Sequence, residues 1–174
     1  MPGEALIFVA VLATVTPVAV SLSVTPSVKL VPAPGWIATL IEAPSVPAFC
    51  RVAATLKPTP ESNIRIEVWL PPAETWNGKF LGTGNGGAGG VISYPALANG
   101  LAKGYATTNT DMGTTTTGLD FGFGVGHREM VVDWGYRATH LMTQVAKQVA
   151  KSYYKRDPQQ SYFMGCSTGG HQAL

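Results

Sequence analysis

The segment that most constrains this chain is Gly165-Cys166-Ser167-Thr168-Gly169, which follows the apolar run 161–164 and precedes the helix-compatible residues 171–174. A G-x-S-x-G pattern between a strand and a helix is typical of a sharp turn that exposes a serine hydroxyl at its tip. Glycines are needed there because the backbone segments approach too closely for a Cβ atom. We therefore predict that Ser167 is a nucleophile. A Gly/Ser-rich turn without function matches the same pattern, but the preceding strand favours the nucleophile.

The hydrophobic pattern upstream of this turn indicates an α/β layered fold. Alternating apolar residues in segments 50–56 and 64–70 predict an antiparallel hairpin with its turn at 57–63. Three further strands are expected at 79–81, 105–110 and 161–164. Helices are expected at 93–103, ended by Gly104, and from Asp133 as N-cap to about Tyr154. This order favours a mixed, mostly parallel sheet, in which strand 161–164 is central in the intact enzyme and takes neighbours on one side from outside this chain.

The N-terminal residues differ from the rest of the chain. Residues 5–24 are mostly apolar and Val18-Ala19-Val20 offers a cleavage site, so we predict a signal peptide over 1–24. The segment Met1-Pro2-Gly3-Glu4 carries no positive charge, and a misplaced start codon is the alternative. Pro17 and the short unbroken apolar run argue against a stable membrane anchor. Residues 25–46 are expected to be an extended, proline-rich lead-in to a domain over 47–174.

Charge and composition narrow the partners. The net charge is +2, no block of Lys or Arg is present, and a nucleic-acid partner is therefore not expected. Charged residues make up 13% of the chain against a usual ~25%, and glycine and proline are plentiful, which suits a secreted protein, extracellular or periplasmic. Three scattered histidines and two cysteines give no spacing typical of a metal site, so neither a metal nor another cofactor is expected in this chain.

The glycine-rich segment 82–90 is the second informative feature. Acyl transfer by a serine needs two N–H donors aimed at the oxyanion of the tetrahedral intermediate. One is the amide of the residue after the nucleophile, here Thr168, and the other comes from a loop after an earlier strand, with Gly86 or Gly87 as the expected donor. The alternative is a dinucleotide fingerprint formed by Gly82, Gly84 and Gly87 with Asp111 further on. That fingerprint should lead directly into a helix, whereas residues 91–95 delay the helix here.

A serine nucleophile also needs an imidazole base and an acid. The chain contains His127 in a glycine loop, His140 in the middle of a predicted helix, and His171 one turn after Ser167 on its own helix. None of these places suits the base. In α/β-hydrolases the chain order is serine, acid, histidine, so both partners are expected beyond residue 174.

Several motifs together resemble the tannase/feruloyl esterase family, which also includes a bacterial hydrolase of mono-(2-hydroxyethyl) terephthalate. They run in the family's order from about Pro47 to Leu174, and the Gly-Cys-Ser-x-Gly-Gly turn is the most specific. The motifs are Pro47-Ala48-Phe49-Cys50-Arg51-Val52, Val68-Trp69-Leu70-Pro71, Trp76-Asn77-Gly78-Lys79-Phe80, Gly84-Asn85-Gly86-Gly87, Thr110-Asp111-Met112-Gly113 and Gly165-Cys166-Ser167-Thr168-Gly169-Gly170.

The resemblance implies a secreted α/β-hydrolase with a large lid inserted after the nucleophile, often carrying a structural calcium. It also implies a disulfide between Cys166 and a cysteine beside the catalytic histidine. Cys50 and Cys166 each then have their partner outside this chain, and we predict no disulfide between them. The chain departs from the family at two points: His171 stands where the family usually has arginine, and no cysteine precedes Cys50.

We therefore expect the N-terminal part of a serine esterase that cleaves small aromatic esters, of the feruloyl or galloyl type, or plant-polymer esters through an acyl-enzyme. The 174-residue chain alone is expected to be inactive and poorly stable. Two alternatives remain at this point, namely a truncated product without catalytic function and a serine peptidase on the same scaffold. The lid shapes the substrate pocket, so the sequence does not define the acyl group or the alcohol.

Overall fold

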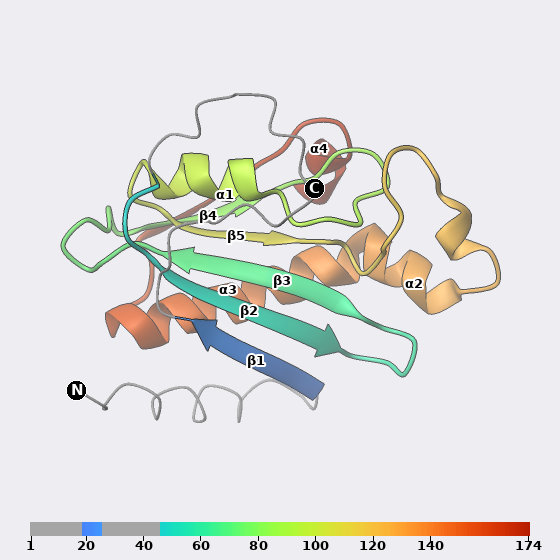
Figure 1. The fold of residues 1–174 in the computed structure, drawn as a ribbon, viewed down its shortest axis with the longest axis horizontal. Coiled ribbons are helices and arrows are strands. Elements are labelled where there is room, and N and C mark those ends of the chain that lie inside the picture. The colour runs from blue at the N-terminus through green and yellow to red at the C-terminus, as the bar shows by residue number, and fades with distance from the viewer. Residues whose placement is uncertain (1–18, 26–45) are drawn as a thin grey trace.

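The computed structural model describes residues 19–25 and 46–174, which form a six-stranded mixed sheet with helices on both faces (Figure 1). The strand order is β1-β2-β3-β5-β4-β6. The pairs β5–β4 and β4–β6 are parallel, whereas β1, β2 and β3 join through antiparallel pairs, as the predicted α/β fold with an antiparallel hairpin requires. The strands are β1 Ala19–Thr25, β2 Cys50–Lys57, β3 Ile64–Leu70, β4 Lys79–Thr83, β5 Ala106–Thr110 and β6 Gln160–Met164.

Strand β1 lies at the end of the range expected to be a signal peptide. It pairs antiparallel with β2, from Ala19 opposite Lys57 to Thr25 opposite Arg51. Residues 1–18 and 26–45, which hold most of the expected signal peptide and lead-in, lie outside the described residues. The signal peptide therefore stays a prediction.

Strand β3 is more deeply buried than its alternating pattern predicts. Its first-face residues pack against helix α3 (Ala138–Tyr154) in the main core. On the second face Glu67 and Trp69 are also buried, and Arg65 alone among the strand's residues is exposed. The reason is helix α1 (Tyr94–Leu101), which covers this face and packs with Trp69 in a second apolar cluster.

The long C-terminal helix begins earlier than the sequence predicts. Helix α2 spans Arg128–Val132, a single π-helical turn spans Asp133–Arg137, and α3 follows without a break. Asp133 is therefore a buried residue inside the helical run and the expected N-cap role is wrong. Its Oδ1 lies 3.1 Å from Nη1 of Arg137, one helical turn further along the chain. Asp133 therefore has an oppositely charged partner inside the helical run, whereas an N-cap residue would lie at the helix end. The run ends where expected, with Lys155 in the left-handed conformation at φ 58°.

Strand β6 lies at the edge of the described sheet, where β4 is its partner. Tyr162 and Met164 are exposed by 45% and 51% on this strand. The residues after it form helix α4 (Thr168–Gln172) rather than another strand. The expected second neighbour is therefore not among the described residues.

The two cysteines are far apart in the sheet. Cys50 begins β2 and Cys166 follows β6, and four strand spacings separate these strands, which is roughly 19 Å. No disulfide joins them in the structure, and the expectation that each has its partner elsewhere stays a prediction. Within the described residues no helix has the length and apolar character needed to cross a membrane.

Candidate active site

Ser167 stands at the tip of a sharp turn between β6 and α4. Its φ of 57° and ψ of −122° lie in a region that residues with a side chain rarely adopt, at a cost of about 1–3 kcal/mol. The residue is exposed, and its Oγ makes no hydrogen bond to any described residue. The strand, turn and helix predicted from the motif are thus present, and the strained turn leaves the hydroxyl accessible.

Close backbone packing explains the glycines of the motif. A Cβ atom on Gly165 would lie 2.3 Å from the carbonyl oxygen of Gly169, and one on Gly84 would lie 2.5 Å from the Cα of Gly169. Three glycines from the turn and from the loop after β4 therefore touch one another through their backbones. This contact brings the loop 84–90 against the first turn of α4.

The same loop exposes two backbone N–H groups beside Ser167. Most amides of the loop are engaged: Gly84 donates to Met164 O at 2.9 Å, Ala88 to Gly118 O at 2.7 Å, and Gly90 to Asp111 O at 2.9 Å. The amides of Gly86 and Gly87 have no acceptor among the described residues. The same holds for the amide of Thr168 in the first helical turn, where no intrahelical acceptor exists.

A side-chain contact joins these donors. Thr168 Oγ1 donates to the carbonyl oxygen of Gly87 at 2.7 Å, so the residue after Ser167 is bound directly to the loop. The predicted site residues Ser167, Thr168, Gly86 and Gly87 thus belong to one cluster at the carboxyl ends of β4 and β6. Figure 1 shows α4 beside the loop that leaves β4. Chemically, an exposed hydroxyl next to unpaired N–H donors can attack a carbonyl carbon while the donors bind its oxygen.

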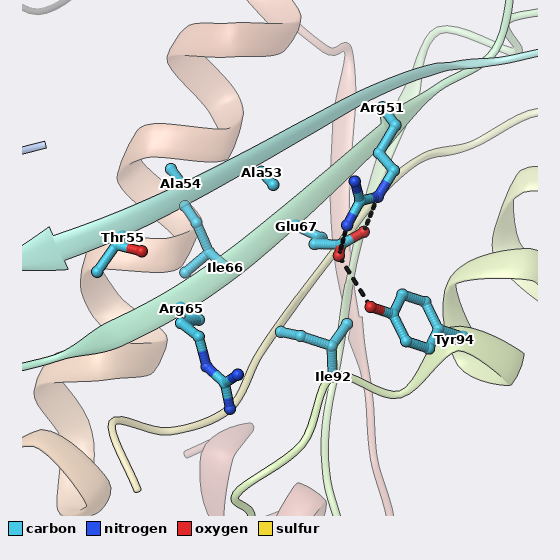
Figure 2. A pocket seen from close by; sticks show the side chains of 9 residues that line it. All are labelled: Arg51, Ala53, Ala54, Thr55, Arg65, Ile66, Glu67, Ile92 and Tyr94. Atoms are coloured by element: carbon cyan, nitrogen blue, oxygen red, sulfur yellow. Dashed lines mark hydrogen bonds and ion pairs between the residues drawn. The ribbon is translucent and has the colours of Figure 1, made fainter. Parts of the chain in front are cut away.

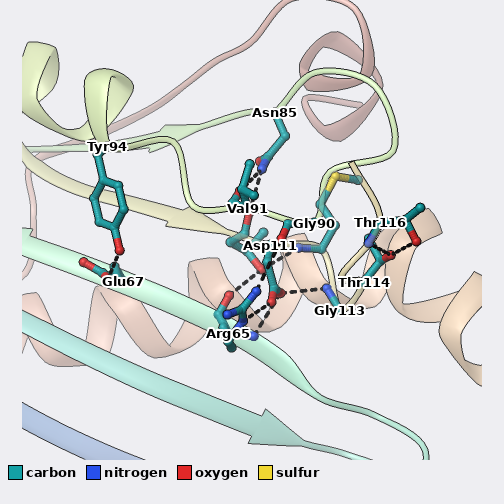
Figure 3. Close-up of polar contacts among 12 residues, drawn as sticks. Arg65, Glu67, Asn85, Gly90, Val91, Tyr94, Asp111, Gly113, Thr114 and Thr116 are labelled. Carbon is teal, nitrogen blue, oxygen red and sulfur yellow. Dashed lines mark hydrogen bonds and ion pairs between the residues drawn. The ribbon is translucent and has the colours of Figure 1, made fainter. Parts of the chain in front are cut away.

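A buried asparagine that sequence reasoning did not single out holds the loop in place through hydrogen bonds. Asn85 Nδ2 donates to Val91 O at 2.8 Å and to Thr110 O at 2.9 Å (Figure 3). Its backbone N–H donates to Gln172 Oε1 at 2.7 Å. The signal available in the sequence was its place in the Gly84-Asn85-Gly86-Gly87 motif, but the motif gives no partner.

The structure argues against the alternative that Gly82, Gly84, Gly87 and Asp111 form a dinucleotide-binding site. The Asp111 carboxylate would have to bind a ribose hydroxyl, yet it already accepts hydrogen bonds from the Arg65 N–H at 3.0 Å, Arg65 Nε at 2.6 Å and the Gly113 N–H at 2.9 Å. Asp111 is buried, and burial raises the pKa of its carboxyl although these hydrogen bonds act against the rise. The glycine loop also continues for ten residues before α1 begins at Tyr94. Asp111 is a structural residue that holds the loop after β5 (Figure 3).

None of the three histidines forms a hydrogen bond with Ser167 Oγ through its ring in the described part of the chain. His127 Nδ1 lies 3.8 Å from Glu61 Oε2, and His140 is exposed on α3. The His171 ring stacks on Trp134 at a centroid distance of 5.3 Å. These placements agree with the inference that none is the base, and an acid and histidine beyond residue 174 stay a prediction.

Across residues 19–25 and 46–174 no group of three or more His, Cys, Asp or Glu could hold a metal.

A concave region lies over β2 and β3, and none of the residues that line it belongs to the Ser167 cluster. This pocket of about 280 Å³ contains Arg51, Arg65, Glu67 and Tyr94 (Figure 2). Glu67 is 4% exposed and accepts from Arg51 Nε at 2.8 Å, from Arg51 Nη2, from Tyr94 OH at 3.1 Å and from Trp69 Nε1 at 2.8 Å. Its oxygens are fully used, so the pocket offers no free base or nucleophile there.

The fold and the turn around Ser167 define an α/β-hydrolase, and comparison with known proteins identifies the family. The family model "Tannase and feruloyl esterase" matches residues 50–174, and the chain belongs to this family. It is 38% identical over 127 residues to a probable feruloyl esterase B-2 of Aspergillus flavus, covering 72% of this chain and 23% of that protein. It is 40% identical over 130 residues to an uncharacterized esterase of Xanthomonas campestris, covering 75% of this chain and 22% of the relative.

Solved structures agree with this assignment. Feruloyl esterase B from Aspergillus oryzae superimposes with a TM-score of 0.73 at 36% identity, covering 91% of this chain and 30% of that one. Tannin acyl hydrolase from Aspergillus niger has a TM-score of 0.60 at 22% identity, covering 87% of this chain and 28% of that one, and supports the fold alone. The chain spans less than a quarter of the length of the curated relatives it matches.

Proposed function

We propose that this chain supplies the nucleophile and oxyanion donors of a serine carboxylic-ester hydrolase that acts on aromatic esters of the feruloyl or galloyl type. The observation that carries the proposal is the conformation of Ser167, strained at φ 57° and exposed next to unpaired backbone amides. A strained residue with an accessible hydroxyl has no structural purpose that a glycine would not serve with less strain.

In the proposed reaction, Ser167 Oγ attacks the ester carbonyl carbon and its proton passes to a histidine base. The oxyanion is bound by the amides of Thr168 and of Gly86 or Gly87. The intermediate then expels the alcohol, which takes the proton from the histidine and leaves an acyl-enzyme. Water attacks the acyl-enzyme in the same geometry, releases the carboxylic acid and restores the Ser167 hydroxyl.

The remaining parts of the enzyme are proposed from the family resemblance. An acid, a histidine and a lid that holds a structural calcium would follow residue 174, and Cys166 would pair with a cysteine beside that histidine. Secretion, extracellular or periplasmic, fits this disulfide and a plant-polymer ester as substrate. Without acid and base the 174-residue chain would keep at most roughly 10³–10⁴-fold acceleration over water, from the oxyanion donors.

A fusion protein tests the proposal directly. The whole 174-residue chain is joined to the part of Aspergillus oryzae feruloyl esterase B that follows its matching segment; we call this the completed fusion. We expect enzyme-like turnover of methyl ferulate or methyl gallate by the completed fusion and, at most, the small residual rate from the 174-residue chain. A folded completed fusion without esterase activity would favour a non-catalytic product, and cleavage of peptides but not esters would favour the peptidase.

A further inference from the structure

The last residue of α4 connects the two sets of amides around Ser167. Gln172 Oε1 accepts the backbone N–H of Asn85 at 2.7 Å, and Gln172 Nε2 donates to Thr139 Oγ1 at 3.0 Å. Asn85 directly precedes Gly86 and Gly87, whereas Thr168 begins the helix that Gln172 ends. One side chain therefore ties the glycine loop to the helix that carries the other donor and anchors both on α3.

We propose that Gln172 is a positioning residue that sets the spacing between the oxyanion donors of the glycine loop and of Thr168; this rests on the proposed function. Oxyanion donors act only within about 2.7–3.1 Å of the developing charge, so their separation must be fixed before the substrate binds. Glycine loops have large backbone freedom, and the two loop residues with unpaired amides, Gly86 and Gly87, are both glycines. Fixing the Asn85 amide orients the chain just before them.

The chemistry of an amide side chain suits this task. The Asn85 N–H requires an acceptor and Thr139 Oγ1 is bound by a donor, and glutamine presents one of each at a fixed separation. Both polar groups of Gln172 are used in this way. Gln172 therefore acts through the loop and not by contact with the substrate.

Steady-state kinetics of the completed fusion on methyl ferulate test this proposal. Gln172→Met keeps the length of the side chain and removes both hydrogen bonds, so kcat should fall about 10- to 100-fold, while KM stays within about twofold. Gln172→Glu keeps the acceptor for Asn85 and should retain most of kcat. Thr143→Val is the matched control on α3, because the Thr143 hydroxyl bonds Thr139 O at 2.9 Å without reaching the loop, and its kcat should not change.

Four results separate the possible failures. If the unchanged fusion is folded and inactive, the proposed function fails and this inference fails with it. If the unchanged fusion is active and Gln172→Met matches it in kcat, only the positioning role is overturned. Should Gln172→Met not fold, Thr139→Val removes the distant contact alone and should lower kcat less, with KM constant. Hydrogen exchange of the Asn85 amide in the completed fusion should accelerate in Gln172→Met, and an unchanged exchange rate would overturn the inference.

Discussion

The Ser167 turn and the Glu67 cluster, formed by Glu67, Arg51, Tyr94 and Trp69, use polar groups in opposite ways. Around Ser167 the hydroxyl and the amides of Gly86, Gly87 and Thr168 have no acceptor or donor among the described residues. In the Glu67 cluster both carboxylate oxygens accept two hydrogen bonds each. The hydrogen bond to Glu67 raises the pKa of the Arg51 guanidinium. Burial and the charge of Glu67 raise the pKa of the Tyr94 phenol.

The difference distinguishes polar groups that are available for a reaction from polar groups that stabilise the fold. A buried polar group without a partner costs about 1–3 kcal/mol, so the interior cluster is satisfied. Polar groups that are to bind or attack a substrate must be accessible, and the Ser167 hydroxyl lies at an exposed turn. Mutations in the first region should therefore change activity without changing stability, and mutations in the second should do the reverse.

The largest expected effect is the loss of the hydroxyl. Ser167→Ala in the completed fusion should lower kcat on methyl ferulate by at least about 10⁴-fold, because the hydroxyl proposed to attack the ester carbonyl is lost. Stability should change by less than about 0.5 kcal/mol, since the exposed Oγ makes no protein hydrogen bond. A fluorophosphonate probe should label Ser167 in the parent fusion. Retained turnover in the variant would remove Ser167 from the mechanism.

Removing Glu67 should cost the most stability. Glu67→Ala leaves the Arg51 guanidinium and the Trp69 and Tyr94 donors without their acceptor, so urea unfolding should show a loss of about 3–5 kcal/mol. Glu61→Ala is the matched control, because its contact with His127 at 3.8 Å is exposed on both sides and should be worth less than about 1 kcal/mol. Equal losses for the two variants would contradict the structural role of the cluster.

Two glycines of one loop should respond differently to a methyl group. Gly84→Ala places a Cβ atom 2.5 Å from the Gly169 backbone, which cannot move without displacing the turn, so we expect a loss of about 1–3 kcal/mol. Gly86→Ala meets no atom within 4 Å and should be close to neutral for stability. Thermal unfolding of both variants measures the difference, and a neutral Gly84→Ala would show that the contact is looser than described.

The smallest expected effect concerns pH. Burial raises the pKa of the Asp133 carboxyl, although the Ser62 side chain and Arg137, whose Nη1 lies 3.1 Å from Oδ1, act against the rise. The folded state then holds this proton more tightly than the unfolded state. Stability is therefore lost as pH rises from the usual aspartate range through the raised pKa. In Asp133→Asn the loss of stability as pH rises above the usual aspartate range, about pH 4, should be weaker by urea unfolding. Parallel pH profiles of the two proteins would show that the carboxyl is not perturbed.

Local sequence determined most of the helices and strands and the sharp turn at Ser167. The predictions that depended on a few neighbouring residues agree with the structure. They are the strands predicted from the alternation in 50–56 and 64–70, the sharp turn predicted from the glycines around Ser167, and the left-handed residue Gly104 after the first helix. The family and its fold also followed from short motifs in order. These features were predictable because steric limits on the backbone and the periodicity of strands act within one segment.

Tertiary structure decided what lies opposite each residue. Burial of Glu67 and Trp69 depends on α1, which lies some thirty residues further along the chain, and the helix start at Arg128 overrode the capping preference of Asp133. The links of Gln172 to Asn85 and Thr139 join residues 87 and 33 positions apart. Such contacts arise only when the sheet order brings β4, β6 and α3 together. The residue type fixes which hydrogen bonds a side chain can make, but only the tertiary structure decides its partner.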